Sequence, residues 1–82
     1  MTNHDVADAR RAATLIAHYA TGNTEGCNYV LREANAQNRV TPLIEALLSV
    51  YGTVVPLLHS EVGVAAIRAC IAKLAMREEN EQ

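Results

Sequence analysis

Residues 49–60 read SVYGTVVPLLHS, and this stretch decides how the centre of the fold is built. Gly52, Thr53, Val55 and Pro56 each disfavour a helix interior, through backbone entropy, β-branching or a missing N–H. The apolar spacing nevertheless indicates a helix that begins with Pro42. Two adjacent strips advance by alternating steps of four and three residues, as in a coiled-coil seam: Leu43, Leu47, Val50, Val54 and Leu57, and beside them Ile44, Leu48, Tyr51, Val55 and Leu58.

The proline falls on the outward side of this helix. A third strip with the same spacing lies opposite the apolar strips and consists of Glu45, Ser49, Gly52, Pro56 and His59. The ring of an internal proline crowds the residue four positions earlier, which here is Gly52 and has no side chain. We therefore predict one helix over residues 42–59 that is capped by Thr41 and kinked near Gly52–Pro56.

Three further helices are expected, over about residues 5–20, 24–37 and 61–79. Gly22 suits the left-handed position just past the first helix. Asn23 or Thr24 suits the N-cap of the second helix, and Ser60 suits that of the last. No stretch indicates a strand of useful length. The predicted fold class is all-α, a compact four-helix bundle in one domain over residues 1–82, with a proline-kinked central third helix.

The first two helices each show one apolar face. In helix 5–20 this face consists of Val6, Ala9, Ala13, Ile16, Ala17 and Ala20. Arg11, Thr14 and His18 share the opposite face, which we expect to be solvated. In helix 24–37 the apolar stripe is narrower and consists of Cys27, Val30, Leu31 and Ala34.

The last helix shows two apolar faces, and Arg68 and Lys73 separate them on either side. The large-residue face consists of Val64, Ile67, Ile71 and Leu74. The small-residue face consists of Val62, Ala65, Ala69, Ala72 and Met76. A surface helix needs only one apolar face. The second face is therefore covered either within the protomer or by a partner, and the sequence leaves both alternatives open.

Composition narrows the class of protein. Half of the 82 residues are hydrophobic, Trp and Phe are absent, and the net charge is −2. So small a domain buries a modest share of its surface and gains stability by oligomerising. The slightly acidic balance disfavours a nucleic-acid binder that works by overall charge. The longest uncharged segment, residues 46–60, is shorter than the ~20 residues of a membrane helix. The first 11 residues contain acids and no apolar segment, so we do not expect them to be a secretory signal. We expect a cytoplasmic protein without a membrane partner.

No pattern indicates site chemistry. His4, His18 and His59 stand on different segments, and neither Cys27 nor Cys70 has metal or redox spacing relative to them. We expect both cysteines in the core, where a thiol is inert. Neither a phosphate-binding loop nor a dinucleotide fingerprint occurs. The expectation is a protein that is not an enzyme and holds neither a cofactor nor a metal.

The run TEGCNYVLREANAQNRVTPLIEALLSVYG, residues 24–52, resembles small Ala-rich helical proteins of actinomycetes and their phages. The resemblance lies in the style of sequence, over about the middle third of the chain. It implies an all-helical fold. Because the function of those proteins is largely unassigned, the resemblance assigns no role to any residue.

The functional expectation is a small interaction or regulatory protein that acts by contact, as a homodimer. Two helices carry more apolar surface than one small protomer covers. The predicted interface consists of Tyr51, Val55, Leu58, Val62, Ala69 and Met76, with Tyr51 as its aromatic anchor. The alternative is a dimeric DNA-associated transcriptional accessory protein, whose nucleic-acid contacts would be Arg10, Arg11 and Arg39.

Overall fold

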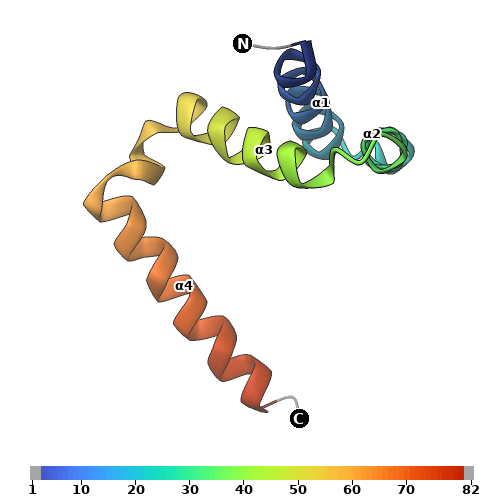
Figure 1. The fold of residues 1–82 in the computed structure, drawn as a ribbon. Helices are drawn as coiled ribbons and strands as arrows, with labels where there is room; N and C mark the ends of the chain where they lie inside the picture. Colours follow the sequence, from blue (N-terminus) through green and yellow to red (C-terminus); the bar gives the residue numbers. More distant parts are fainter. Residues whose placement is uncertain (1–2, 81–82) are drawn as a thin grey trace. The chain divides into compact units, whose positions relative to one another are not determined.

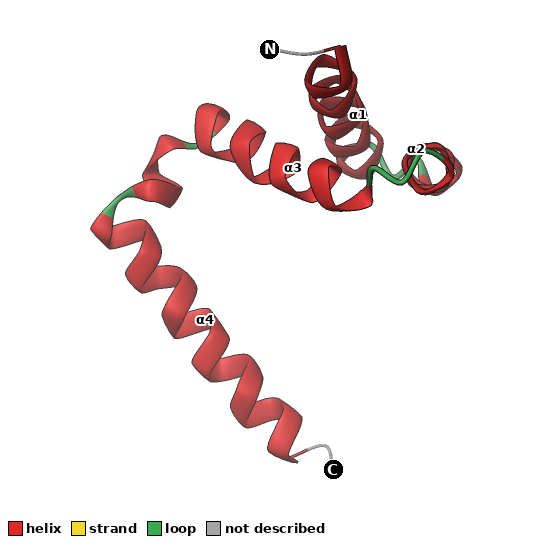
Figure 2. Ribbon diagram, in the orientation of Figure 1, coloured by secondary structure: helices red, strands yellow, loops and turns green. Residues whose placement is uncertain are grey.

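The computed structural model describes residues 3–80, which are helical throughout apart from short connections (Figures 1 and 2). In chain order the elements are α1 (Asn3–Ala20), α2 (Thr24–Ala36), α3 (Val40–Val54), the short 3-10 helix η1 (Pro56–His59) and α4 (Glu61–Asn80). No strand occurs in residues 3–80, so the predicted all-α class is confirmed. The packing of all four helices into one bundle stays a prediction.

The chain forms two compact units that meet within α3. The first unit ends at Tyr51, and the second begins at Gly52. The first unit therefore contains α1, α2 and most of α3. The second contains the last turn of α3, η1 and α4.

The connection between α1 and α2 follows from glycine and asparagine, as predicted. Gly22 adopts φ +72°, and the N–H of Asn23 donates to the carbonyl of His18 at 2.8 Å. The N–H of Gly22 donates to Tyr19 at 3.1 Å, which completes a Schellman motif. Asn23 then caps α2, because its Oδ1 accepts from the N–H of Gly26 at 2.9 Å.

The same motif ends α2, with asparagine in place of glycine. Asn38 adopts φ +57°, a conformation that asparagine tolerates better than most residues. The N–H of Arg39 donates to Ala34 at 2.8 Å, and the N–H of Asn38 donates to Asn35 at 3.1 Å. This tight ending lets α3 begin immediately afterwards, at Val40.

The predicted start of the third helix is wrong by two residues. The carbonyl of Arg39 accepts the N–H of Leu43 at 2.9 Å, so Arg39 is the N-cap and Thr41 lies inside the first turn. Pro42 is tolerated there because the first N–H groups of a helix have no intrahelical partner. The motif at Asn38 thus determines the start of the helix.

The predicted continuous, kinked helix over residues 42–59 does not form. Helix α3 ends at Val54, Val55 is non-helical with φ −126° and ψ 75°, and η1 follows over Pro56–His59. The ring of a proline pushes the preceding residue out of the α region, and Pro56 has no N–H to continue the ladder. At Val55 this restriction outweighs the regular apolar spacing.

The second unit contains a tight corner between η1 and α4. Ser60 caps α4, as predicted: its Oγ accepts from the N–H of Gly63 at 3.1 Å and donates to the carbonyl of Leu57 at 2.6 Å. Gly63 is buried, and a Cβ there would lie 1.9 Å from the Leu57 carbonyl oxygen. A Cβ on Gly52 would lie 2.0 Å from the His59 ring. Gly63 therefore permits this corner, and Gly52 leaves room for the His59 ring against the last turn of α3.

The core of the first unit is small. Its buried hydrophobic residues are Ala12, Val30, Ala34 and Leu43, and Leu43 is only 1 % exposed. Leu15, Ala46, Leu47 and Val50 are partly buried and pack against the cluster of Ala12, Ala34 and Leu43. Leu43 is the largest fully buried side chain and brings α3 onto the α1–α2 pair.

Helix α1 is rotated relative to the sequence-based expectation. Asp8 and Arg11 are 3 % and 5 % exposed. By contrast, Val6 and Ala9 on the predicted apolar face are exposed, as are Ala13, Ala17 and Ala20. The prediction that Arg11 is solvated is therefore wrong. The reason is that Arg11 and Asp8 find partners of opposite charge, which removes much of the cost of burying them.

Candidate functional site

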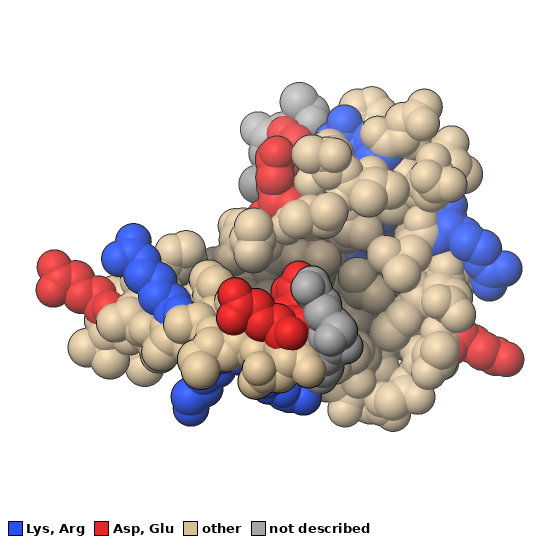
Figure 3. Space-filling model, turned by 90° about the horizontal axis from the view of Figure 1, so that it is seen from below, with Lys and Arg blue, Asp and Glu red and all other residues tan. Residues whose placement is uncertain are grey.

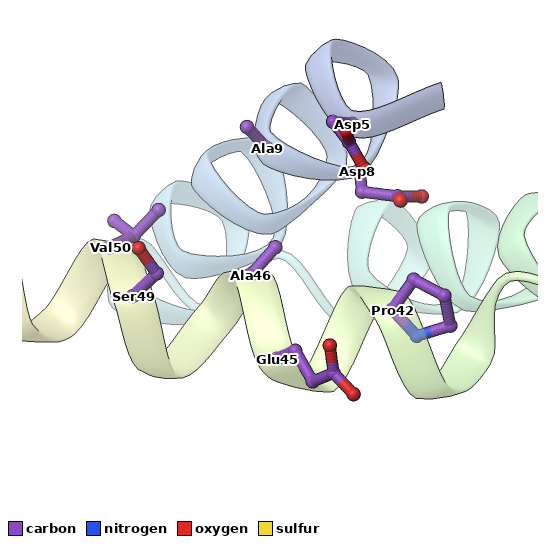
Figure 4. Close-up of a pocket in the computed structure, with 8 residues that line it drawn as sticks. All are labelled: Asp5, Asp8, Ala9, Pro42, Glu45, Ala46, Ser49 and Val50. Atoms are coloured by element: carbon purple, nitrogen blue, oxygen red, sulfur yellow. The ribbon is translucent and has the colours of Figure 1, made fainter. Parts of the chain in front are cut away.

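A groove lies between α1 and α3 in the first unit, with a volume of about 280 Å³ (Figure 4). Its apolar lining consists of small side chains: Ala9, Pro42, Ala46 and Val50. Its polar lining consists of Asp5 and Asp8 from α1 and of Glu45 and Ser49 from α3. We call this feature the acidic groove, because all its charged lining residues are carboxylates.

Asp8 is the structural carboxylate of this groove. Its Oδ1 accepts from Arg39 Nε at 3.3 Å and from Arg11 Nη1 at 3.5 Å, and its Oδ2 accepts from Arg39 Nη2. The hydrogen bonds from Arg39 are the main cause that lowers the pKa of Asp8 below its ordinary value of 3.8. Asp8 therefore stays ionised and ties α1 to the start of α3.

The other two carboxylates of the groove keep their side chains exposed. Asp5 and Glu45 both lie close enough to Arg39 to contribute to the raised pKa of its guanidinium, after the dominant hydrogen bond to Asp8. Arg39 thus faces three carboxylates, and one of them, Asp8, also accepts from Arg11. Both arginines stand outside the lining of the groove, whose own charged residues are all carboxylates.

A second ion-pair cluster joins α1 to α2. Arg11 Nε donates to Glu33 Oε1 at 2.8 Å, and Arg10 Nη2 donates to the same oxygen at 3.2 Å. These bonds, the one from Arg11 first, lower the pKa of Glu33. Since Arg11 also contacts Asp8, it lies between both clusters and connects the three helices of the unit.

The three arginines proposed as nucleic-acid contacts are thus all engaged by carboxylates. Arg11 is buried, Arg39 is partly buried, and only Arg10 keeps most of its side chain exposed, at 61 %. The DNA-associated alternative depends on these residues and loses support here, because a phosphate would have to compete with Asp8 and Glu33. The feature of the sequence that could have indicated these ion pairs is the i, i+3 spacing of Asp8 and Arg11.

An apolar groove of about 350 Å³ also belongs to the first unit. It lies among α1, α2 and α3 and is lined by Leu15, Ile16, Tyr19, Cys27, Leu31, Leu47 and Tyr51. Cys27 is half-buried, and its Sγ lies 4.0 Å from the Leu15 carbonyl oxygen. Tyr51, the predicted aromatic anchor, therefore lines a hollow and does not stand on a flat face.

Helix α4 is the longest helix, and nearly all of it is exposed. Gly63 is its one buried residue. On the small-residue face Val62 and Met76 are 70 % and 64 % exposed, and on the large-residue face Ile67, Ile71 and Leu74 are exposed as well. The space-filling view in Figure 3 shows charged side chains standing apart among uncharged surface. Cys70 is exposed, so its predicted place in the core is wrong.

The predicted interface residues fall in both units. Tyr51 belongs to the first unit, and the other five belong to the second. Val62, Ala69 and Met76 are seven residues apart, are exposed, and share one face of α4. Val55 is exposed in the break before η1, whereas Leu58 is half-buried in η1.

Within residues 3–80, no group of three or more His, Cys, Asp and Glu side chains is placed to hold a metal ion. None of the helices in this part of the chain has the length and apolar content needed to cross a membrane. Comparisons with protein-family models, with curated proteins and with solved structures found no match.

Proposed function

We propose that this chain is a small, non-enzymatic protein-interaction or regulatory module that acts as a homodimer in the cytoplasm. The observation that carries the proposal is α4: of its 20 residues only Gly63 is buried, although two apolar faces run along it. A helix of this length is marginal in water unless its apolar face packs against something. Association is the simplest source of that packing.

The size of the exposed surface supports association energetically. Burying one Val, Leu, Ile or Met side chain contributes about 1.5–3 kcal/mol. Val62 and Met76, at the two ends of the small-residue face, are both more than half exposed. The residues between them include alanines, whose small side chains let a partner helix approach the backbone of α4 closely. We take this face of α4 as the core of the interface.

Sedimentation equilibrium of the full chain over a hundredfold dilution series tests the proposal. We expect a mass near twice the 8.9 kDa of one chain at the concentrated end, falling toward one chain on dilution. A mass of one chain throughout the series would refute the homodimer.

A matched pair of variants assigns the surface. Ala69→Gln places a bulky polar group on the small-residue face and should shift the equilibrium to the monomer. Ala66→Gln changes the same residue type three positions away, at the edge of this face beside Lys73, and should shift the equilibrium much less. Equal effects of the two substitutions would show that the face assigned to the interface is wrong.

A further inference from the structure

We propose that the acidic groove of one copy binds the small-residue face of α4 from a second copy. The inference rests on the proposed function, because it names the surface that α4 meets when the chain dimerises. Shape is its first support. The acidic groove is lined by small apolar side chains, including Ala9 and Ala46, and the face that would enter it is built mainly of alanine.

Charge complementarity is the second support, and it favours the acidic groove over the apolar groove. Asp5 and Glu45 are exposed carboxylates at the acidic groove. On α4, Arg68 flanks the small-residue face on one side and Lys73 flanks it on the other. Both cations are exposed. Glu61 and Glu79 share the edge of Arg68, whereas the edge of Lys73 carries no carboxylate. A helix seated by its alanines therefore brings positive charge toward the groove carboxylates mainly through Lys73.

Symmetry is the third support. Each copy carries one acidic groove and one α4, so a pair of copies offers two matched pairs of surfaces. Filling both would give an isologous dimer, in which each copy uses the same two surfaces and no acidic groove is left for a third copy. Two insertions also bury twice the surface area of one insertion. A single helix face is small, so this second insertion brings the buried area closer to that of a specific interface.

Two charge-reversed variants of the full chain test the proposal. The groove variant is Asp5→Lys with Glu45→Lys, and the helix variant is Arg68→Glu with Lys73→Glu. In a dimer of either variant alone, the groove and the inserted helix carry charges of the same sign. The dissociation constant of that dimer should therefore rise at least tenfold. In a one-to-one mixture both insertions are matched again, and the dissociation constant should return to near the wild-type value, now as a heterodimer.

The outcomes separate this inference from the proposed function. Variants that each dimerise as the wild type does would overturn the inference and leave the homodimer standing. Variants that are monomers both alone and mixed would also overturn it, since no complementary pairing is recovered. A wild-type chain that is itself a monomer would overturn the homodimer and the inference together.

Two controls complete the test. Glu25→Lys reverses an exposed charge on α2 that lines neither groove, and its dissociation constant should match the wild type. Far-ultraviolet circular dichroism of every variant establishes that the helices are retained. Heterodimer formation by the mixture gives the same assurance, because only folded partners can rescue each other.

Discussion

Gly63→Ala should open the corner between η1 and α4 while leaving the rest of α4 helical. At an ordinary helix position this substitution stabilises the helix by about 1 kcal/mol. Here the new Cβ would lie 1.9 Å from the Leu57 carbonyl oxygen and 3.0 Å from Leu58 Cα. Both are backbone atoms, so no side-chain rotation relieves the contact. The corner must separate.

The cost of opening follows from the bonds that hold the corner. Separation breaks the two bonds that Ser60 donates to the Leu57 carbonyl, one from its Oγ and one from its N–H. Each contributes about 0.5–1.5 kcal/mol, so the loss is roughly 1–3 kcal/mol, comparable to the gain in helix propensity. Total helicity therefore barely changes, and the effect is local.

Amide hydrogen exchange followed by NMR resolves this local effect. The Ser60 amide donates to Leu57 at 3.0 Å, and in Gly63→Ala it should exchange about tenfold faster, as expected for ~1.4 kcal/mol. Amides from Ile67 onward should be unchanged. Gly52→Ala is the matched control, because its Cβ would meet the His59 ring, which can rotate away. Unchanged protection of Ser60 in Gly63→Ala would refute the assigned role of the glycine.

Three further predictions concern the first unit. Leu43→Ala truncates the largest fully buried side chain and should lower the free energy of unfolding by about 2–5 kcal/mol, measured by urea titration; an unchanged midpoint would contradict the core assignment. Gly22→Ala places a Cβ at φ +72° and should cost about 1–2 kcal/mol, whereas Gly22→Asn should cost less in the same titration. The lowered pKa values of Asp8 and Glu33 mean that their stabilisation is fully present above the unfolded values of 3.8 and 4.5 and is lost as pH falls through the lower folded values. The thermal midpoint should therefore fall with acidification below about pH 4.5, and a midpoint that stays level would count against the two ion-pair clusters.

Three helix ends follow from the sequence better than the helix faces do. Gly22, Asn23 and Ser60 act where the capping rules place them, because capping depends on a few neighbouring residues. Thr41 does not cap α3, because the motif at Asn38 lets the helix begin two residues earlier. The face of α1 was not predictable in this way: a helical wheel treats Asp8 and Arg11 as solvent-facing, and only the partners supplied by Glu33 and Arg39 make their burial possible.

The break in α3 shows two local rules in competition. The apolar strips favoured a continuous helix, and Pro56 opposed it. Val55 carries the restriction that a proline places on the residue before it, and this restriction ends the helix at Val54. For the candidate site, the sequence identifies exposed apolar residues on α4. The acidic groove combines Asp5 with Glu45, which are 40 positions apart in the sequence, so spacing alone does not reveal it.

The most direct test of the central claim is hydrogen exchange of the wild-type chain at several protein concentrations. If a second copy covers α4, protection of the amides at Ala69 and Ala72 should rise with concentration. Protection at Leu43, in the core of the first unit, should change much less. Protection of α4 that is the same at every concentration would contradict the claim that a second copy covers this helix.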